Sequence, residues 1–197
     1  MHVIFYEGFT VSAKLIEPLI SDLYILEPLE KSHANEMYAG LCSIDDYKFI
    51  PTNPPANLDE LTAHYERISQ RYSPDKSQIW LNWVIIHRQS DAYLGYVQST
   101  IMVEKNWAYI AYHVFGRYQK RGVAKQCVRI VIDFLFNNYK LSHVDALIDS
   151  RNLASIGLVE CLKLKKINEL KDADFFKGST SNEFHYRVFD NEWATKA

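Results

Sequence analysis

The sequence predicts a single α/β domain in which a mixed, mostly antiparallel central sheet of about six or seven strands is flanked by helices. Two observations support this fold class. Segments with apolar residues at three- and four-residue steps alternate with short apolar, β-branched and aromatic runs of strand length. The 197 residues also contain no linker, repeat or low-complexity tract that would divide the chain into two domains.

The first half of the chain is expected to contain one short strand and two helices. Residues 23–26 have strand character, and residues 33–41 have helical character. Asn57 followed by Glu60 resembles a capping box and predicts a second helix, because apolar residues then recur at helical spacing. The segment between the two helices contains three prolines and is expected to be a loop.

In the second half of the chain, the spacing of apolar residues alternates between strand-like and helix-like several times. Residues 79–87, 93–102 and 107–115 predict three strands of an antiparallel meander, and the third is apolar enough to be covered on both faces. A helix is expected after Gly122, followed by a strand at 144–148 and a helix at 153–164. Two final strands are expected at 166–170 and 184–189, with a polar loop between them.

Composition excludes several classes of protein. The 22 Lys and Arg residues nearly balance the 24 Asp and Glu residues, so no overall positive field would hold nucleic acid or an anionic membrane. No apolar run approaches the roughly 18 residues of a membrane span, and residues 1–7 lack the pattern of a signal peptide. The three cysteines have no CxxC spacing and are expected to be reduced. We therefore expect a cytoplasmic protein without nucleic-acid or membrane partners.

The most informative motif is Gln119-Lys120-Arg121-Gly122-Val123-Ala124, which follows the most apolar strand and opens an amphipathic helix. The first N–H groups of a helix have no intrahelical partners and lie at the positive end of the helix dipole. A glycine there lets the backbone approach an anion closely, so the segment can form a phosphate cradle. It is neither a Walker loop nor a GxGxxG fingerprint. Positive side chains gather at the same place: Arg117, Lys120, Arg121 and Lys125.

This segment resembles the Q/R-x-x-G-x-G/A acetyl-CoA pyrophosphate loop of the GNAT acyltransferase superfamily. Asn152-Leu153-Ala154-Ser155 begins 33 positions after Gln119 and is similar to the N-x-x-S signature of GNAT members related to ribosomal-protein N-terminal acetyltransferases. Residues 111–114 and 172–178 resemble a strand and a loop of the same branch. The resemblance identifies residues 21–189 as a GNAT fold within a single domain of residues 1–197, with residues 1–20 as an extra N-terminal segment.

The resemblance implies that acetyl-CoA is the co-substrate and that no metal is needed. Backbone groups on the strand at 109–114 would bind the pantetheine arm and polarise the thioester carbonyl, and the N–H groups that follow would hold the pyrophosphate. Asn152 would fix the pantetheine or an ordered water, although it equally fits a helix cap. The expected cofactor-binding residues are Tyr112, Val114, Gln119, Lys120, Arg121, Gly122, Val123, Ala124, Lys125 and Asn152.

The resemblance also suggests which residues move protons. Ser155 occupies the position of a hydroxyl that would protonate the departing thiolate, or it is simply a polar residue of the first helical turn. Many GNAT members carry a tyrosine acid where this chain has Val159. The base is less defined, because the central strand lacks the family's glutamate. Glu104, His113 and Tyr109 are the candidates, and water could also serve; His113 equally fits a packed core residue, and Glu104 a solvated turn residue.

The function expected from these features is an N-acetyltransferase that moves an acetyl group to a primary amine by direct attack. A protein N-terminus or a small-molecule amine would be the acceptor, bound beneath the first two helices and the loop between them. That segment carries Glu36, Tyr38, Asp45, Asp46, Tyr47, Phe49, Tyr65 and Tyr72. The alternative is a catalytically silent GNAT-fold module that binds acyl-CoA or supports a partner. Both a monomer and a homodimer fit the sequence.

Overall fold

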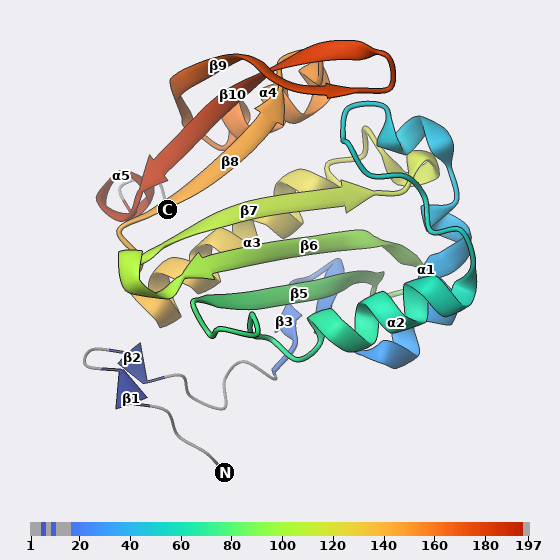
Figure 1. The fold of residues 1–197 in the computed structure, drawn as a ribbon. Coiled ribbons are helices and arrows are strands. Elements are labelled where there is room, and N and C mark those ends of the chain that lie inside the picture. The colour runs from blue at the N-terminus through green and yellow to red at the C-terminus, as the bar shows by residue number, and fades with distance from the viewer. Residues whose placement is uncertain (1–4, 7–8, 11–16, 195–197) are drawn as a thin grey trace.

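The computed structural model describes residues 5–6, 9–10 and 17–194. The expectation of no signal peptide concerns residues 1–7, most of which lie outside this described part. Strands β1 (Phe5–Tyr6) and β2 (Phe9–Thr10) form a two-stranded sheet of their own. The main sheet has eight strands in the order β3-β4-β5-β6-β7-β8-β10-β9 (Figure 1). This order confirms the predicted mixed, mostly antiparallel sheet, with slightly more strands than the six or seven expected.

The predicted meander is present almost residue for residue. Strands β5 (Gln78–His87), β6 (Tyr93–Met102) and β7 (Trp107–Val114) pair antiparallel, and β6 has the predicted bounds. Two strands precede them, β3 (Leu19–Ile20) and β4 (Tyr24–Pro28). β-Branched and aromatic residues are frequent in these strands. Because successive side chains point to opposite faces of the sheet, every second side chain lies in the core beneath it.

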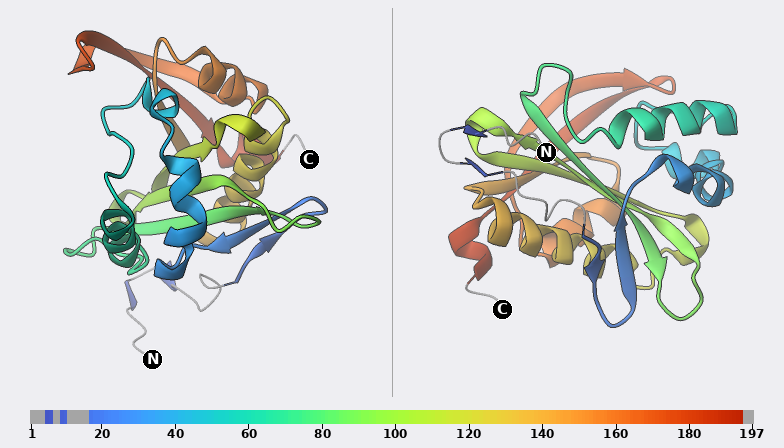
Figure 2. Two further views of the ribbon diagram at one scale, coloured as in Figure 1. Left: turned by 90° about the vertical axis from the view of Figure 1, so that its right-hand side faces the viewer. Right: turned by 90° about the horizontal axis from the view of Figure 1, so that it is seen from below.

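Helices cover both faces of the sheet (Figure 2). On one face, α3 (Val123–Tyr139) and α4 (Leu153–Cys161) bury the larger core with residues such as Val131 and Val159. On the other face, α1 (Ala34–Leu41) and α2 (Leu58–Ile68) pack over β5 and β6 in a smaller core that includes Met37 and Leu61. We call these the α3 face and the α1–α2 face. Asn57 caps α2 as predicted, because its side chain accepts from the Glu60 N–H.

The C-terminal part differs from the prediction. Strand β8 (His143–Asp149) is as expected, and α5 (Asp190–Ala194) ends the described chain. The predicted polar loop at residues 171–183 is wrong: β9 (Lys165–Phe176) and β10 (Ser179–Phe189) form one long hairpin with a turn at Lys177 and Gly178. Helix α4 also ends before the predicted Leu164, because Lys163 adopts a positive φ of 68°.

Two further findings concern membrane-spanning helices and the state of the cysteines. Among the described residues, no helix is both long and apolar enough to cross a membrane. The three cysteines are free thiols, of which Cys127 is buried in the α3 core while Cys42 and Cys161 are exposed. Burial raises the pKa of the Cys127 thiol to about 12, so this group stays protonated at neutral pH.

Candidate functional site

Strands β7 and β8 lie side by side only at their beginnings. Their parallel pairing runs from Trp107 and His143 to Tyr109 and Asp145 and then stops, after which the strands diverge (Figure 1). On its other side, β7 remains paired with β6 as far as Val114. The second half of β7 therefore presents a backbone edge that no other strand of the described chain occupies.

The register decides which groups lie along this open edge. The Phe115 N–H donates to the Leu94 carbonyl of β6, and backbone groups alternate along an antiparallel strand. The N–H and C=O groups of Tyr112 and Val114 consequently point away from β6 and toward the opening. An unpaired strand edge of this kind can bind an extended chain that carries amide groups. The structure thus places the backbone groups of Tyr112 and Val114 along the open edge of β7.

Gly122 opens α3 with a left-handed backbone, φ 79° and ψ 0°, and no side chain caps the helix. The N–H groups of Val123, Ala124 and Lys125 therefore form a free first turn. A Cβ atom added to Gly122 would meet only the Gln126 Nε2 atom, 3.9 Å away, so the space in front of the turn is open. This geometry suits an anion that approaches the backbone closely.

Positive charge surrounds this turn, which we call the anion cradle (residues 120–125). Lys120, Arg121 and Lys125 are exposed, and within the described part of the chain none of them forms an ion pair. Lys120 also has a positive φ of 59°, which turns the backbone before Gly122. Three unpaired cations beside a helix N-terminus favour a multiply charged anion such as a pyrophosphate.

Gln119 does not belong to the anion cradle, although the sequence grouped it there. Its Nε2 atom donates to the Val114 carbonyl at 2.9 Å and to the Asp46 carboxylate at 3.2 Å. Gln119 therefore connects the open edge of β7 with the segment between α1 and α2. Since a carbonyl has two lone pairs, the Val114 oxygen can still accept a second hydrogen bond.

The start of α4 faces the open edge from the α3 side. Asn152 caps this helix by accepting from the Ser155 N–H at 3.1 Å, which confirms the capping alternative. The Tyr112 hydroxyl donates to the Ser155 carbonyl at 3.3 Å. Burial raises the pKa of Tyr112 to about 12, so its hydroxyl keeps its proton at neutral pH. Val159 is fully buried and contributes no polar group.

On the α1–α2 face, His113 and Asp46 form a buried pair. The His113 Nε2 and Asp46 Oδ2 atoms are 3.6 Å apart, and each is buried without a hydrogen-bond partner. The Tyr96 ring stacks on the imidazole at 5.6 Å, and the Tyr47 and Phe115 rings lie within 6 Å. Burial lowers the pKa of His113, and the Asp46 carboxylate opposes that shift. The imidazole is consequently held neutral among aromatic rings.

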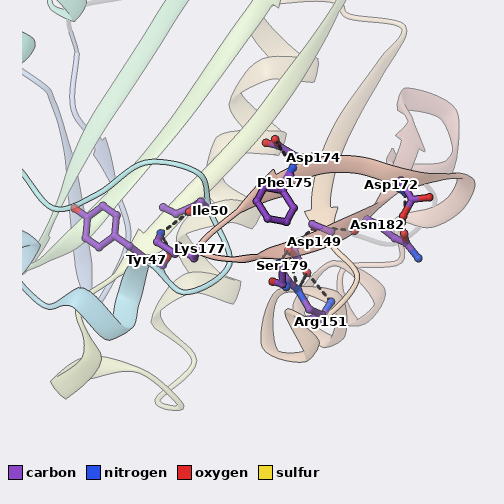
Figure 3. Close-up of polar contacts among 11 residues, drawn as sticks. Tyr47, Ile50, Asp149, Arg151, Asp172, Asp174, Phe175, Lys177, Ser179 and Asn182 are labelled. Carbon is purple, nitrogen blue, oxygen red and sulfur yellow. Dashed lines mark hydrogen bonds and ion pairs between the residues drawn. The ribbon is translucent and has the colours of Figure 1, made fainter.

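Lys177, at the tip of the β9–β10 hairpin, ties the hairpin to the segment between α1 and α2 (Figure 3). Its Nζ atom donates to the carbonyl oxygens of Tyr47, Ile50 and Thr52, the last two at 2.6 Å and 2.9 Å. Because these contacts join residues more than a hundred positions apart, they fix the distance between the two walls that flank the α1–α2 face. We call this contact the Lys177 clamp; no local pattern in the sequence predicts it, because Lys177 falls in a segment expected to be a loop.

Next to Lys177, the tip end of the hairpin is also held by Arg151. Its Nε atom donates to the Asp149 carboxylate at 2.9 Å, and its guanidinium also reaches the Ser179 hydroxyl (Figure 3). The buried Ser181 hydroxyl donates to the same carboxylate at 2.6 Å. These contacts, together with the Arg151 backbone N–H, hold the pKa of Asp149 below its usual range.

Glu104 does not join the other predicted residues. It lies in the turn Val103–Lys105 that precedes β7, whereas the anion cradle follows the other end of that strand. Ten positions separate Glu104 from Val114, which in extended chain is roughly 30 Å. No metal-binding group of three or more His, Cys, Asp or Glu side chains occurs in the described part of the chain.

Comparison with known proteins assigns this arrangement to a family. The family model of the acetyltransferase (GNAT) domain matches residues 24–165. The uncharacterized N-acetyltransferase p20 of Bacillus licheniformis is 25% identical over 111 residues, which are 56% of this chain and 62% of that protein. The chain thus spans less than two thirds of the length of this curated relative.

Two solved structures share the fold. The ribosomal-protein-S5-alanine acetyltransferase of Vibrio fischeri is 15% identical, with a TM-score of 0.77 over 90% of this chain and 98% of that one. The spermidine N-acetyltransferase of Vibrio cholerae, solved with CoA and spermine, is 15% identical, with a TM-score of 0.76 over 88% and 99%. Because the family model covers most of the chain, this protein belongs to the GNAT acetyltransferase family.

Proposed function

We propose that this protein is an acyl-CoA-dependent N-acyltransferase that moves an acetyl group from acetyl-CoA to a primary amine by direct attack. The observation that carries the proposal is the divergence of β7 and β8 directly before the anion cradle. An open strand edge matches the amide-bearing pantetheine arm, and the cradle matches the pyrophosphate at the end of that arm. Family membership and the CoA bound to a relative of the same fold support it.

The cofactor would be held mostly by main-chain groups. The N–H and C=O groups of Tyr112 and Val114 would bind the arm, and one of these N–H groups would polarise the thioester carbonyl during attack. The first-turn N–H groups of α3 would bind the pyrophosphate, with Lys120, Arg121 and Lys125 supplying charge. In this proposal Asn152 acts by capping α4, and so orients the turn that carries Ser155.

Protonation of the leaving thiolate would occur at the start of α4. Ser155 and the Tyr112 hydroxyl meet there, beside the open edge of β7. Because the pKa of Tyr112 is raised to about 12, this hydroxyl is available as a proton donor at neutral pH. Ser155 is the other donor in this proposal, and either side chain lies on the side opposite the acceptor amine.

The acceptor would enter from the α1–α2 face, between the segment after α1 and the β9–β10 hairpin. The buried rings of Tyr47 and Phe115 and the half-buried ring of Tyr96 pack around His113 there, beside the Asp46 carboxylate. Such surroundings suit a primary amine that carries positive charge before it reacts. The spermine bound to a structural relative is an amine of this kind.

A thiol-release assay with acetyl-CoA and a panel of amines tests the proposal. The panel should include a polyamine, an aminoglycoside and a peptide with a free N-terminus, and calorimetry with CoA should accompany it. We expect CoA binding together with amine-dependent thiol release. Binding without release for every amine would favour a silent acyl-CoA-binding module, and no CoA binding would contradict both functions.

A further inference from the structure

A second histidine–carboxylate pair lies at the point where β7 and β8 separate. Asp145 is paired with Tyr109 in the last step of the parallel ladder. Its neighbours Val144 and Ala146 point into the α3 core, so the Asp145 side chain points to the α1–α2 face, where the acceptor would enter. Although Asp145 is fully buried, three hydrogen bonds from two side chains, His185 and Arg187, satisfy its carboxylate.

The contacts of Asp145 orient His185 of β10. Arg187 donates to both carboxylate oxygens, from Nε at 2.7 Å and from Nη2 at 2.8 Å. The His185 Nε2 atom lies 2.7 Å from Oδ2. Because an ionised carboxylate only accepts hydrogen bonds, Nε2 must carry the hydrogen, and in the neutral imidazole Nδ1 then has the free lone pair.

The free nitrogen of His185 is accessible, in contrast to that of His113. The His185 side chain is 21% exposed, whereas that of His113 is 9% exposed and its Nε2 atom is fully covered. No hydrogen bond to the His185 Nδ1 atom occurs within residues 17–194. A base that takes a proton from a substrate needs both a lone pair and a path to that substrate. His185 meets both conditions, and His113 lacks the second.

Charged and polar groups face His185 from the strands around it. Asp145 and His143 face it from β8, Glu183 and Arg187 from β10, and Tyr109 from β7, while Asn168 is its neutral partner on β9. Around this imidazole, the carboxylates of Asp145 and Glu183 therefore outnumber the single guanidinium of Arg187. Burial of Tyr109, together with the nearby charges of Asp145 and Glu183, raises the pKa of that tyrosine, so it does not compete as a base at neutral pH.

We infer that the Nδ1 atom of His185 accepts the proton of the incoming ammonium group, and that Asp145 is the residue that positions the imidazole. This inference rests on the proposed N-acyltransferase function. The ammonium gives one proton to Nδ1 and becomes a neutral amine, whose lone pair forms a bond to the thioester carbonyl carbon. The C–S bond then breaks, the nitrogen loses its second proton, and the thiolate takes up one. Each turnover releases one proton to water.

The test compares His185→Gln with the matched control His143→Gln. Glutamine can still donate to Asp145 but cannot take up a proton at neutral pH. His143 lies 3.7 Å from the same carboxylate, toward the start of β8 and away from the opening. Both variants are assayed for CoA affinity, kcat and KM between pH 6.5 and 9.5, with one acceptor of amine pKa near 8 and one near 10.

We expect His185→Gln to bind CoA normally and to lower kcat about 100-fold at pH 7, within the usual range for a general base. The deficit should shrink as pH rises, because the amine then loses its proton without help, and it should be smaller for the less basic acceptor. His143→Gln should follow the unchanged protein. An equal loss at every pH, or a normal kcat, would overturn the inference. Absence of thiol release from the unchanged protein would instead overturn the proposed function, and this inference with it.

Discussion

The two sides of the separation between β7 and β8 are built differently. The side that would bind CoA comes from one continuous segment, residues 110–125, and its groups are mostly main-chain N–H and C=O. The α1–α2 face is assembled from distant side chains, including those of Asp46, His113, Lys177 and His185. Under the proposed function, the shape of the backbone would define the cofactor site, whereas side-chain identity would define the acceptor site.

The largest effect should come from Gly122→Val, which tests the side that would bind CoA through main-chain groups. A branched side chain in the left-handed conformation costs about 1–2 kcal/mol and would fill the open space of the anion cradle. We expect CoA affinity measured by calorimetry to fall more than about 100-fold, with the circular dichroism spectrum retained.

Gly178→Val is the matched control for that strain. Gly178 has a φ of 77° in the hairpin turn, and a Cβ there would meet nothing within 4 Å. The control should carry a similar strain and keep normal CoA affinity. If both variants lost CoA binding alike, the anion cradle would not be the site of the phosphates.

The next largest effect should come from Lys177→Met, which tests the α1–α2 face, the side assembled from side chains. The substitution keeps an unbranched side chain but removes all three hydrogen bonds to the carbonyls of residues 47–52. Because the two walls of the acceptor site would then move independently, we expect KM for the amine to rise about tenfold while CoA affinity stays unchanged. Lys171→Met, on the exposed strand β9, is the control. A change in CoA affinity alone would contradict the division between the two sides.

A smaller effect on both sides should follow from Gln119→Ala. Gln119 bonds the Val114 carbonyl on the cofactor side and Asp46 on the acceptor side. Loss of these bonds should weaken CoA binding and raise KM for the amine, each about threefold. Titrations of CoA and amine measure the two effects separately, and an effect on only one of them would show that the two sides are independent at this residue.

The smallest effect concerns the loss of folding stability as the pH falls. Burial lowers the pKa of His113 in the folded protein, so between that value and the unfolded value of about 6.5 the unfolded chain binds more protons. Stability is therefore lost as pH falls through this window. We expect His113→Gln to reduce the drop in Tm between pH 7.5 and 5.5 by about 2–4 °C. An unchanged drop would mean that His113 gains its proton without unfolding.

Patterns of apolar residues in the sequence predicted the helices and strands that bury one face. Strand β6 was predicted at its observed bounds because its side chains alternate between buried and partly exposed positions. Strand β9 is exposed along nearly its whole length, so it has no apolar alternation, and the sequence predicts a loop over its second half, residues 171–176. Its hairpin turn uses positive φ angles at Lys177 and Gly178, and a lysine at such a position is a weak signal.

The candidate site shows the same division. The turn at Gly122 could be predicted because it is local in sequence and needs only a glycine directly before a helix. Asp46 was expected only as one of several acceptor-side charges, since nothing local indicates that it meets His113. His185 and Asp145 were missed because only the pairing of β10 with β8 brings them together, 40 residues apart in the chain.

The Lys177 clamp has a consequence for the diversity of such proteins. Its three acceptors are main-chain carbonyls, which persist whatever side chains replace Tyr47, Ile50 and Thr52. Apart from its first residue, Lys165, the hairpin that carries Lys177 also lies beyond residues 24–165, where the family model matches. Under the proposed function, substitutions in the loop would alter acceptor preference while the spacing of the walls is preserved, and selectivity would change without rebuilding the half of the molecule that would bind CoA.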